Sequence, residues 1–281
     1  MAGEKIAVVT GTTSGIGREI VRGLLDQGYT VVAHARSADK AEAELAKLDA
    51  SQRARVQRVL ANLSSRADVN RMADDLATRF PKIDLLIHNA AVVPKTRIET
   101  SEGLDECFMT NVLAPFILTK RLDPALRAGA PSRVQLFWGG GQNTFDIDDL
   151  QSKKAKRYDG WAAYCQTKNA CALLVGELAR RSKNGGVSYF AVLPGLVNTE
   201  GMRGLSNFVF STLLRPMYRT PAEGARTALW VAREPGLESR SGACFGSAIG
   251  SGWRNEAKPG KNATDPELAS RLYAKCEELA G

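Results

Sequence analysis

The chain of 281 residues has few histidines, no closely paired cysteines and no long apolar run. Its two histidines, His34 and His88, both lie in apolar, strand-like segments, so we expect no metal site. The five cysteines are scattered without a CxxC pair, which is typical of reduced thiols in a cytoplasmic protein. No run of about 18 apolar residues occurs, and the strand pattern begins too early to leave room for a signal peptide. We therefore expect a cytoplasmic protein without a membrane span.

The formal net charge of +8 raises the question of a nucleic-acid partner. The basic residues are dispersed apart from two short clusters, at 153–157 and 180–183. The first cluster lies in a polar segment, and the second lies at the end of a predicted helix, where cations suit the helix dipole. We therefore expect solvated charge and no nucleic-acid partner, with attraction of an anionic cofactor or substrate as the alternative.

Short runs rich in Val, Ile and Leu alternate with segments of helical period along the chain, as at Ile16, Ile20 and Leu24. Near-continuous apolar strands that alternate with helices predict a parallel sheet covered on both faces. The predicted strands are 5–10, 30–35, 55–60, 83–88, 133–138, 187–193 and 243–247. We therefore predict one doubly wound, Rossmann-type α/β domain over residues 1–281, with ligands at the carboxyl ends of the strands.

A glycine-rich turn follows the first predicted strand, with the spacing Gly11-x3-Gly15-x-Gly17, and an amphipathic helix begins within it. Glycines at such a place let the backbone turn tightly and approach a diphosphate, which then faces the helix N-terminus. A glycine-rich turn alone is weak evidence, but this one has the required strand before it and helix after it. The segment therefore predicts a dinucleotide site.

Five motifs, taken in order, resemble those of the short-chain dehydrogenase/reductase family. They are the TGxxxGIG turn at 10–17, Asn89-Ala90-Ala91, Asn111, Tyr164-Cys-Gln-Thr-Lys168, and Pro194-Gly195-Leu-Val-Asn-Thr199. The stretches 149–158 and 271–281 are similar to the retinol-dehydrogenase-like and WW-domain-oxidoreductase-like branch of that family. The resemblance covers essentially the whole chain and implies an oxidoreductase that uses a nicotinamide cofactor.

The resemblance also implies which residues contact the cofactor. Asn62 stands where the family usually has an aspartate that contacts the adenine, and its amide oxygen can still accept that hydrogen bond. The implied cofactor-binding residues are Gly11, Thr13, Ser14, Gly15, Ile16, Gly17, Arg18, Arg36, Asn62, Leu63, Asn89, Ala90, Tyr164, Lys168, Pro194, Gly195, Val197 and Thr199.

The end of the second predicted strand favours NADP(H) over NAD(H). An acidic residue there would bind the ribose 2′-hydroxyl, whereas Arg36 suits a 2′-phosphate. Arg18, inside the glycine turn, can add a second positive charge. The alternative is that both arginines are ordinary surface residues.

Tyr164 and Lys168 lie four residues apart in the predicted helix 160–182 and so share one helix face. A free tyrosine has a pKa near 10, and a neighbouring ammonium group lowers it toward a value useful for acid–base chemistry. The resemblance implies that Tyr164 is the catalytic acid/base, that Lys168 also holds the nicotinamide ribose, and that Asn111 supports a proton-relay water. The alternative for Asn111 is a polar helix residue bonded to backbone.

The fifth predicted strand ends in Phe137-Trp138-Gly139, where the family usually has two serines. The second of those serines is catalytic, and its position falls on Gly139. Deleting one such oxyanion donor typically costs about 10²–10³ in rate. The amides of Gln142 or Asn143, the Thr144 hydroxyl, or backbone N–H groups are candidate replacements. Trp138 would form a flat wall for an aromatic or polycyclic substrate, or would simply fill the core.

Residues 201–217 follow the Pro194-Gly195 motif and are mostly apolar. We interpret the segment at about 200–220 as a cover for a hydrophobic substrate, with a homodimer contact or a membrane-surface helix as alternatives. The leading hypothesis is an NADP(H)-dependent carbonyl reductase or alcohol dehydrogenase that acts on a bulky apolar molecule. The rivals are a cyclase or isomerase of the same fold without ordinary redox turnover, and a non-catalytic binding protein gated by cofactor.

Overall fold

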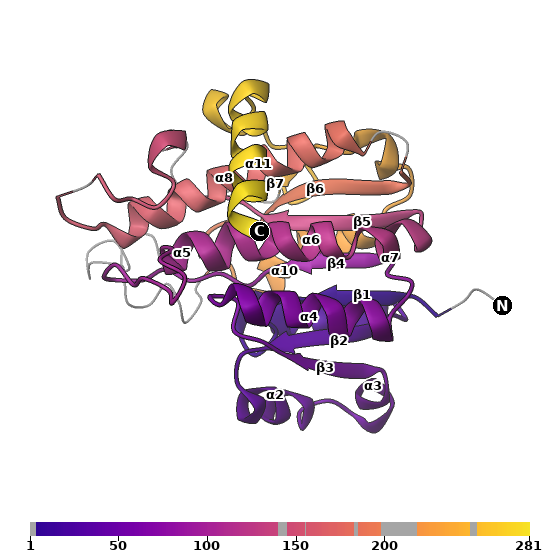
Figure 1. The fold of residues 1–281 in the computed structure, drawn as a ribbon. Helices are drawn as coiled ribbons and strands as arrows, with labels where there is room; N and C mark the ends of the chain where they lie inside the picture. Colours follow the sequence, from indigo (N-terminus) through magenta and orange to yellow (C-terminus); the bar gives the residue numbers. More distant parts are fainter. Residues whose placement is uncertain (1–3, 140–144, 155, 183–184, 198–217, 248–251) are drawn as a thin grey trace.

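Seven parallel strands form one sheet in the computed structural model, which describes residues 4–139, 145–154, 156–182, 185–197, 218–247 and 252–281 (Figure 1). Their order across the sheet is β3-β2-β1-β4-β5-β6-β7, and every neighbouring pair is parallel. The strands are β1 (Ile6–Val9), β2 (Thr30–Ala35), β3 (Val56–Leu60), β4 (Leu85–His88), β5 (Ser132–Phe137), β6 (Val187–Leu193) and β7 (Cys244–Gly246). Each lies within or beside the segment that the apolar runs predict, so the prediction of a doubly wound parallel sheet is confirmed.

Helices cover both faces of this sheet. They are α1 (Gly15–Asp26), α2 (Ala38–Leu45), α3 (Ala50–Ala54), α4 (Arg66–Arg79), α5 (Glu106–Phe108), α6 (Ala114–Arg121), α7 (Asp123–Ala128), α8 (Gly160–Arg181), α10 (Pro221–Arg233) and α11 (Pro266–Ala280). Figure 1 shows α4, α6, α8 and α11 on the near side of the strands. A π-helical turn, η1 (Met109–Leu113), joins α5 to α6 and contains Asn111.

Alternation of side chains along the buried strands divides the core between the two faces. Val8 and Leu86 pack in the larger cluster with α4, α6, α8 and α11, whereas Ala7 and Ile87 pack in a second cluster with α1 and α10. Successive residues of a strand point to opposite faces, and both faces are covered, so β1 and β4 at the centre of the sheet are almost entirely apolar, whereas the edge strand β3 carries exposed polar residues. None of the helices in the described part of the chain combines the length and apolar composition that a membrane crossing requires.

Strand order reverses between β1 and β4, because the chain runs from β1 outward to β3 and then returns to β4 on the other side. At such a switch point the loops after the two central strands diverge and leave a crevice at the carboxyl edge of the sheet. The glycine turn follows β1 and Asn89 follows β4, so the topology brings both motifs to this crevice. Most of the segment expected to cover the substrate, 198–217, lies outside the described residues.

Candidate active site

A cleft of about 390 Å³ opens at the carboxyl edge of the sheet. It is lined by the ends of β1 to β5, by the residue after β6 and by one face of α8. Most of the predicted site residues meet there: Gly11, Thr13, Ser14, Gly15, Ile16, Gly17, Arg36, Asn62, Leu63, Asn89, Ala90, Trp138, Tyr164, Lys168 and Pro194. Of the predicted residues that the structure describes, Arg18, Asn111, Gly139, Gly195 and Val197 lie outside the lining. Gln142, Asn143, Thr144 and Thr199 lie outside the described residues.

The glycine turn has the close approaches that exclude side chains. Gly11 adopts φ +70°, and a Cβ atom there would lie 2.8 Å from the Cα of Ala90. A Cβ atom at Gly17 would lie 2.0 Å from the Gly11 carbonyl oxygen. Asn89 fixes the turn from the neighbouring strand, because its amide nitrogen donates to the carbonyl oxygens of Thr10 at 3.0 Å and Gly11 at 2.8 Å. The turn, the start of α1 and the end of β4 therefore form one packed unit.

The N-terminus of α1 fits an anionic group. Ser14 is the N-cap residue, and its side chain makes no capping hydrogen bond within the described part of the chain. The first turn of α1 also carries no acidic residue. The first backbone N–H groups of a helix have no partner inside the helix and bear a partial positive charge. Because these groups border the cleft, they suit the diphosphate of a dinucleotide.

The structure separates the two arginines that the sequence assigns to a 2′-phosphate. Arg36 lines the cleft directly after β2. Arg18 lies away from it, with its Nε atom 3.2 Å from Glu44 Oε2 of α2. Glu44 is also 2.7 Å from the Lys47 ammonium, so this carboxylate neutralises a basic patch between α1 and α2. The expected second charge of the phosphate site is therefore engaged elsewhere, and Arg36 faces the cleft without it.

Tyr164 and Lys168 lie one turn apart on α8 and both line the cleft. The Lys168 ammonium lies 5.4 Å from the centre of the Tyr164 ring, and Trp161 stacks against that ring at 5.4 Å between centroids. Burial raises the pKa of Tyr164 above its usual value of 10, and the Lys168 charge opposes this rise without cancelling it. The direction of the lysine effect agrees with the sequence prediction, but the net pKa shift is upward.

Asn111 is fastened to backbone behind the cleft. Its side-chain oxygen accepts from the Val92 N–H at 2.8 Å, and its amide nitrogen donates to the Val92 carbonyl at 3.0 Å. The same nitrogen donates to the Thr167 hydroxyl at 3.1 Å, and Thr167 donates to the Tyr164 carbonyl at 2.7 Å. These contacts tie the segment after β4 to the part of α8 that carries Tyr164, which matches the structural alternative for Asn111.

The end of β5 has a backbone shape that suits glycine. Gly139 adopts φ +131°, and a Cβ atom there would lie 2.6 Å from the Leu193 Cδ1 atom. Its neighbour Trp138 packs in the larger core cluster, is 6% exposed and also lines the cleft. Trp138 therefore fills the core and contributes to the cleft wall at once.

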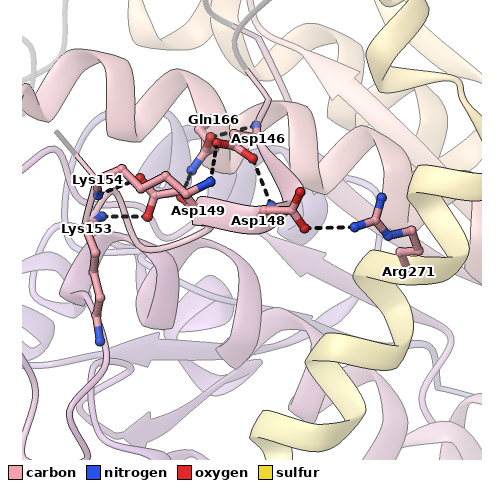
Figure 2. A network of polar contacts seen from close by, with 7 residues as sticks. All are labelled: Asp146, Asp148, Asp149, Lys153, Lys154, Gln166 and Arg271. Carbon is pink, nitrogen blue, oxygen red and sulfur yellow. Dashed lines mark hydrogen bonds and ion pairs between the residues drawn. The ribbon is translucent and has the colours of Figure 1, made fainter.

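A polar network holds the chain beyond β5 against two helices (Figure 2). Gln166 of α8 accepts from the Asp146 N–H at 3.0 Å and donates to the Asp149 carbonyl at 2.7 Å. Asp148 pairs with Arg271 of α11 at 2.8 Å. Gln166 lies two residues after Tyr164, so the segment 145–154 is anchored to the helix that carries the tyrosine. Sequence patterns do not reveal this network, since its partners lie up to 123 residues apart.

Several polar residues of the cleft were not predicted, among them His34, Glu106 and Thr110. The apolar run around His34 predicts only a place inside a strand. Its position two residues before Arg36, at the carboxyl end of that strand, is the feature of the sequence that indicates a place beside the cleft. Among the described residues, no group of three or more His, Cys, Asp or Glu side chains is arranged to hold a metal ion.

The sheet, the glycine turn at its switch point and the Tyr164–Lys168 pair together define a dinucleotide-binding protein of the Rossmann type. Residues 5–137 match the family described as short chain dehydrogenase. Retinol dehydrogenase 13 of Mus musculus is 32% identical to this chain, and the match covers 99% of this chain and 84% of that relative. The chain belongs to the short-chain dehydrogenase/reductase family, which uses NAD(P)(H), and its relatives named here are oxidoreductases.

Two further matches extend this comparison. Polyprenol dehydrogenase of Mus musculus is also 32% identical, over 99% of this chain and 84% of that protein. The crystal structure of an uncharacterized protein from Mycobacterium paratuberculosis superposes with a TM-score of 0.75 at 26% identity. That match covers 99% of this chain and 94% of the other. The match to the family ends at residue 137, whereas the likeness to these two proteins also covers the C-terminal half of the chain.

Proposed function

We propose that this protein is an NADP(H)-dependent oxidoreductase that reduces the carbonyl, or oxidises the alcohol, of a bulky apolar molecule. The observation that carries the proposal is that Tyr164 and Lys168 line the same cleft as the glycine turn and the N-terminus of α1. A titratable hydroxyl and a buried ammonium beside a dinucleotide-type site form the arrangement that hydride chemistry at a carbonyl needs, since a proton must accompany each hydride.

In this proposal the turn at 11–17 and the first N–H groups of α1 hold the diphosphate, and Arg36 holds the 2′-phosphate. Arg36 suits that group because a guanidinium is planar, multidentate and always charged. When bound, the nicotinamide supplies or accepts the hydride. Tyr164 gives its phenolic proton to the substrate oxygen during reduction and takes a proton back during oxidation. Lys168, 4% exposed, lies beside that hydroxyl, with its Nζ atom 5.4 Å from the centre of the Tyr164 ring.

The raised pKa of Tyr164 keeps its phenol protonated at neutral pH. A protonated phenol can donate a proton, whereas oxidation of an alcohol needs the phenolate as acceptor. The proton that carbonyl reduction requires is therefore present on Tyr164 at neutral pH.

Two tryptophans support an apolar substrate. Trp138 forms part of the cleft wall, and Trp161, 39% exposed, stacks on Tyr164. Large aromatic side chains offer apolar contact area with little conformational freedom to lose. The relatives named for retinol and polyprenol dehydrogenation act on apolar alcohols, which agrees with this environment.

The test is NADPH consumption with all-trans-retinal and decanal, with glyceraldehyde as a small polar control. The proposal expects turnover of the apolar aldehydes and little turnover of glyceraldehyde. Tyr164→Phe should remove turnover while NADPH binding, followed by fluorescence, stays close to wild type. A Tyr164→Phe enzyme with full activity would exclude Tyr164 as the proton donor and reject the proposal.

The position of Gly139 favours a second candidate, a cyclase or isomerase that keeps the fold without ordinary redox turnover. The family's catalytic serine falls on this glycine, whose φ of +131° is one that L side chains rarely adopt. Reactions with NADPH deuterated at the reactive carbon separate the two functions. A reductase transfers the deuterium into the product, whereas an isomerase converts its substrate with no deuterium transfer.

A further inference from the structure

His34 is a buried polar residue that the proposed chemistry does not use. It lies in β2, is 3% exposed, and lines the cleft between the glycine turn and the end of β3. Both of its ring nitrogens have partners. The Gly11 N–H donates to Nδ1 at 3.2 Å, and Nε2 lies 3.1 Å from the Ala61 carbonyl oxygen.

These two contacts determine the tautomer of the ring. A backbone N–H can only donate, so Nδ1 accepts from Gly11 and carries no proton. The ring proton then lies on Nε2 and is donated to the Ala61 carbonyl. This arrangement requires a neutral imidazole, and burial lowers the pKa of His34 to about 4, so the ring is neutral at physiological pH.

His34 is hydrogen-bonded to Gly11 and Ala61, which lie on opposite sides of one end of the cleft. Gly11 opens the glycine turn, and its φ of +70° takes its backbone out of the strand conformation. Ala61 follows β3 and lines the cleft together with Asn62 and Leu63. The backbone of His34 adds to the same link, since its carbonyl accepts from the Thr12 N–H at 3.1 Å. One residue of the central strand β2 thus connects elements from both of its neighbours, β1 and β3.

We propose that His34 is a positioning residue that sets the spacing between the glycine turn and the β3 end, and so shapes the site for the adenosine half of the dinucleotide. Arg36, two residues further along β2, borders the same part of the cleft. In dinucleotide-binding sheets of this type the end of the second strand meets the adenosine ribose. The inference rests on the family's use of NAD(P)(H) and is independent of the substrate and of any preference for NADP(H).

His88 provides a matched control. It is also 3% exposed within a central strand, β4, and burial lowers its pKa to about 3. Its Nε2 lies 2.9 Å from the Thr119 hydroxyl, and its Nδ1 has no hydrogen-bond partner among the described residues. His88 is absent from the lining of the cleft, so its replacement should affect stability without affecting cofactor binding.

The experiment measures the affinity of ADP-ribose and 2′,5′-ADP by calorimetry for His34→Phe, His34→Asn, His34→Gln and His88→Gln. An asparagine oxygen can replace Nδ1 as the acceptor for Gly11, and a glutamine nitrogen can replace Nε2 as the donor to Ala61. Loss of one such hydrogen bond corresponds to roughly a tenfold change in an equilibrium constant. We expect His34→Phe to bind both ligands at least roughly tenfold more weakly, and at least one of the two amide variants to recover part of that loss. His88→Gln should bind both as the wild type does.

Nitrogen-15 NMR of histidine-labelled protein tests the geometry without ligand turnover. The chain has two histidines, so the His88→Gln variant assigns both rings. The proposal expects the His34 ring to be protonated at Nε2 alone and its resonances to shift when ADP-ribose is added. A ring protonated at Nδ1 would overturn it. So would a folded His34→Phe protein that binds ADP-ribose with wild-type affinity, or a set of amide variants that both bind as weakly as His34→Phe.

Discussion

At the scale of single residues, Arg36 and Arg18 differ in their surroundings. Arg36 borders the cleft, whereas Arg18 is paired with Glu44. Arg36→Ala should therefore weaken NADPH binding by roughly tenfold or more and leave NADH binding almost unchanged, because a guanidinium–phosphate contact is a strong charge-assisted bond. Fluorescence titration with both cofactors measures this.

Arg18→Ala is the matched control for that prediction, since it removes the same charge from the neighbouring helix. It should change NADPH affinity by no more than about twofold, because the Arg18–Glu44 pair is partly exposed and such pairs contribute little. An Arg18→Ala protein that lost as much NADPH affinity as Arg36→Ala would show that Arg18 leaves Glu44 when the cofactor binds.

Tyr164 leads to a pH prediction at the same scale. Its pKa lies above 10 because burial outweighs the charge of Lys168. Carbonyl reduction, which needs the protonated phenol, should be independent of pH through neutrality and fall only above about pH 10. Alcohol oxidation, which needs the phenolate, should rise with pH over the same range. Single-turnover rates in both directions measure the two profiles.

Lys168→Gln extends this test. Removing the ammonium removes the group that lowers the Tyr164 pKa, so the rise of the oxidation rate should move to still higher pH. A profile that stayed in place would show that Lys168 does not control the ionisation of Tyr164.

At the scale of elements, the end of β5 is built around a glycine. Gly139→Ser would force a side chain into φ +131° and bring its Cβ within 2.6 Å of Leu193. We expect a stability loss of about 1–3 kcal/mol, as is usual for such backbone strain, and no gain in carbonyl reduction. Chemical denaturation and the aldehyde assay measure the two effects.

Gly103→Ser is a milder comparison for this prediction. Gly103 also has a positive φ, but its value of +74° lies nearer the left-handed region that L residues can adopt, and a Cβ atom there would meet nothing within 4 Å. It lacks both the crowding and the larger strain of Gly139→Ser and should destabilise less. A large rate gain from Gly139→Ser would instead mean that β5 accommodates the serine and that the site lacked only its hydroxyl.

Periodicity predicts the elements well and their side-chain partners poorly. The apolar runs indicate all seven strands, because central parallel strands are buried on both faces, and even the edge strand β3 keeps Val56, Val59 and Leu60. The four-residue spacing of Tyr164 and Lys168 likewise places both on one face of α8. The pairing of Arg18 with Glu44 depends on how α1 packs against α2, which no local pattern encodes. The contacts of Asn111 with Val92 and Thr167 likewise join residues 19 and 56 positions apart, which no local pattern encodes.

At the scale of the whole molecule, the helices on the two faces of the sheet contribute different parts of the proposed site. Helices α1 and α10 pack on one face, and α1 presents its N-terminus to the cleft. Helix α8 packs on the other face together with α11 and carries Tyr164 and Lys168. In the proposed function, the diphosphate-holding end of α1 and the proton-carrying Tyr164 of α8 therefore belong to opposite layers. They meet only at the carboxyl edge of the sheet, so the position of the cleft depends on the integrity of the whole sheet.

The sheet also contains both histidines of the chain, and this leads to a prediction for global stability. Burial lowers the pKa of His34 to about 4 and that of His88 to about 3, from an ordinary value of 6.5. Between about pH 6.5 and about pH 4 the unfolded chain therefore binds protons that the folded protein does not. The stability that the two neutral rings provide is complete above pH 6.5 and decreases as the pH falls, by about 1.4 kcal/mol per pH unit for each ring.

Between about pH 5 and about pH 6.5 this effect is largest, because most carboxyl groups of an unfolded chain titrate below the range and its thiols and phenols above it. Burial also raises the pKa of the Asp105 carboxyl in the folded protein, so the slope is assigned to the rings by the two histidine variants. Urea unfolding across this range should show the free energy of unfolding falling by about 2.7 kcal/mol per pH unit at its steepest. His34→Gln and His88→Gln should each remove about half of that slope, since glutamine does not titrate. An unfolding free energy that stayed constant over the range would mean that both rings take up protons in the folded protein, and the buried, neutral state assigned to them would then be wrong.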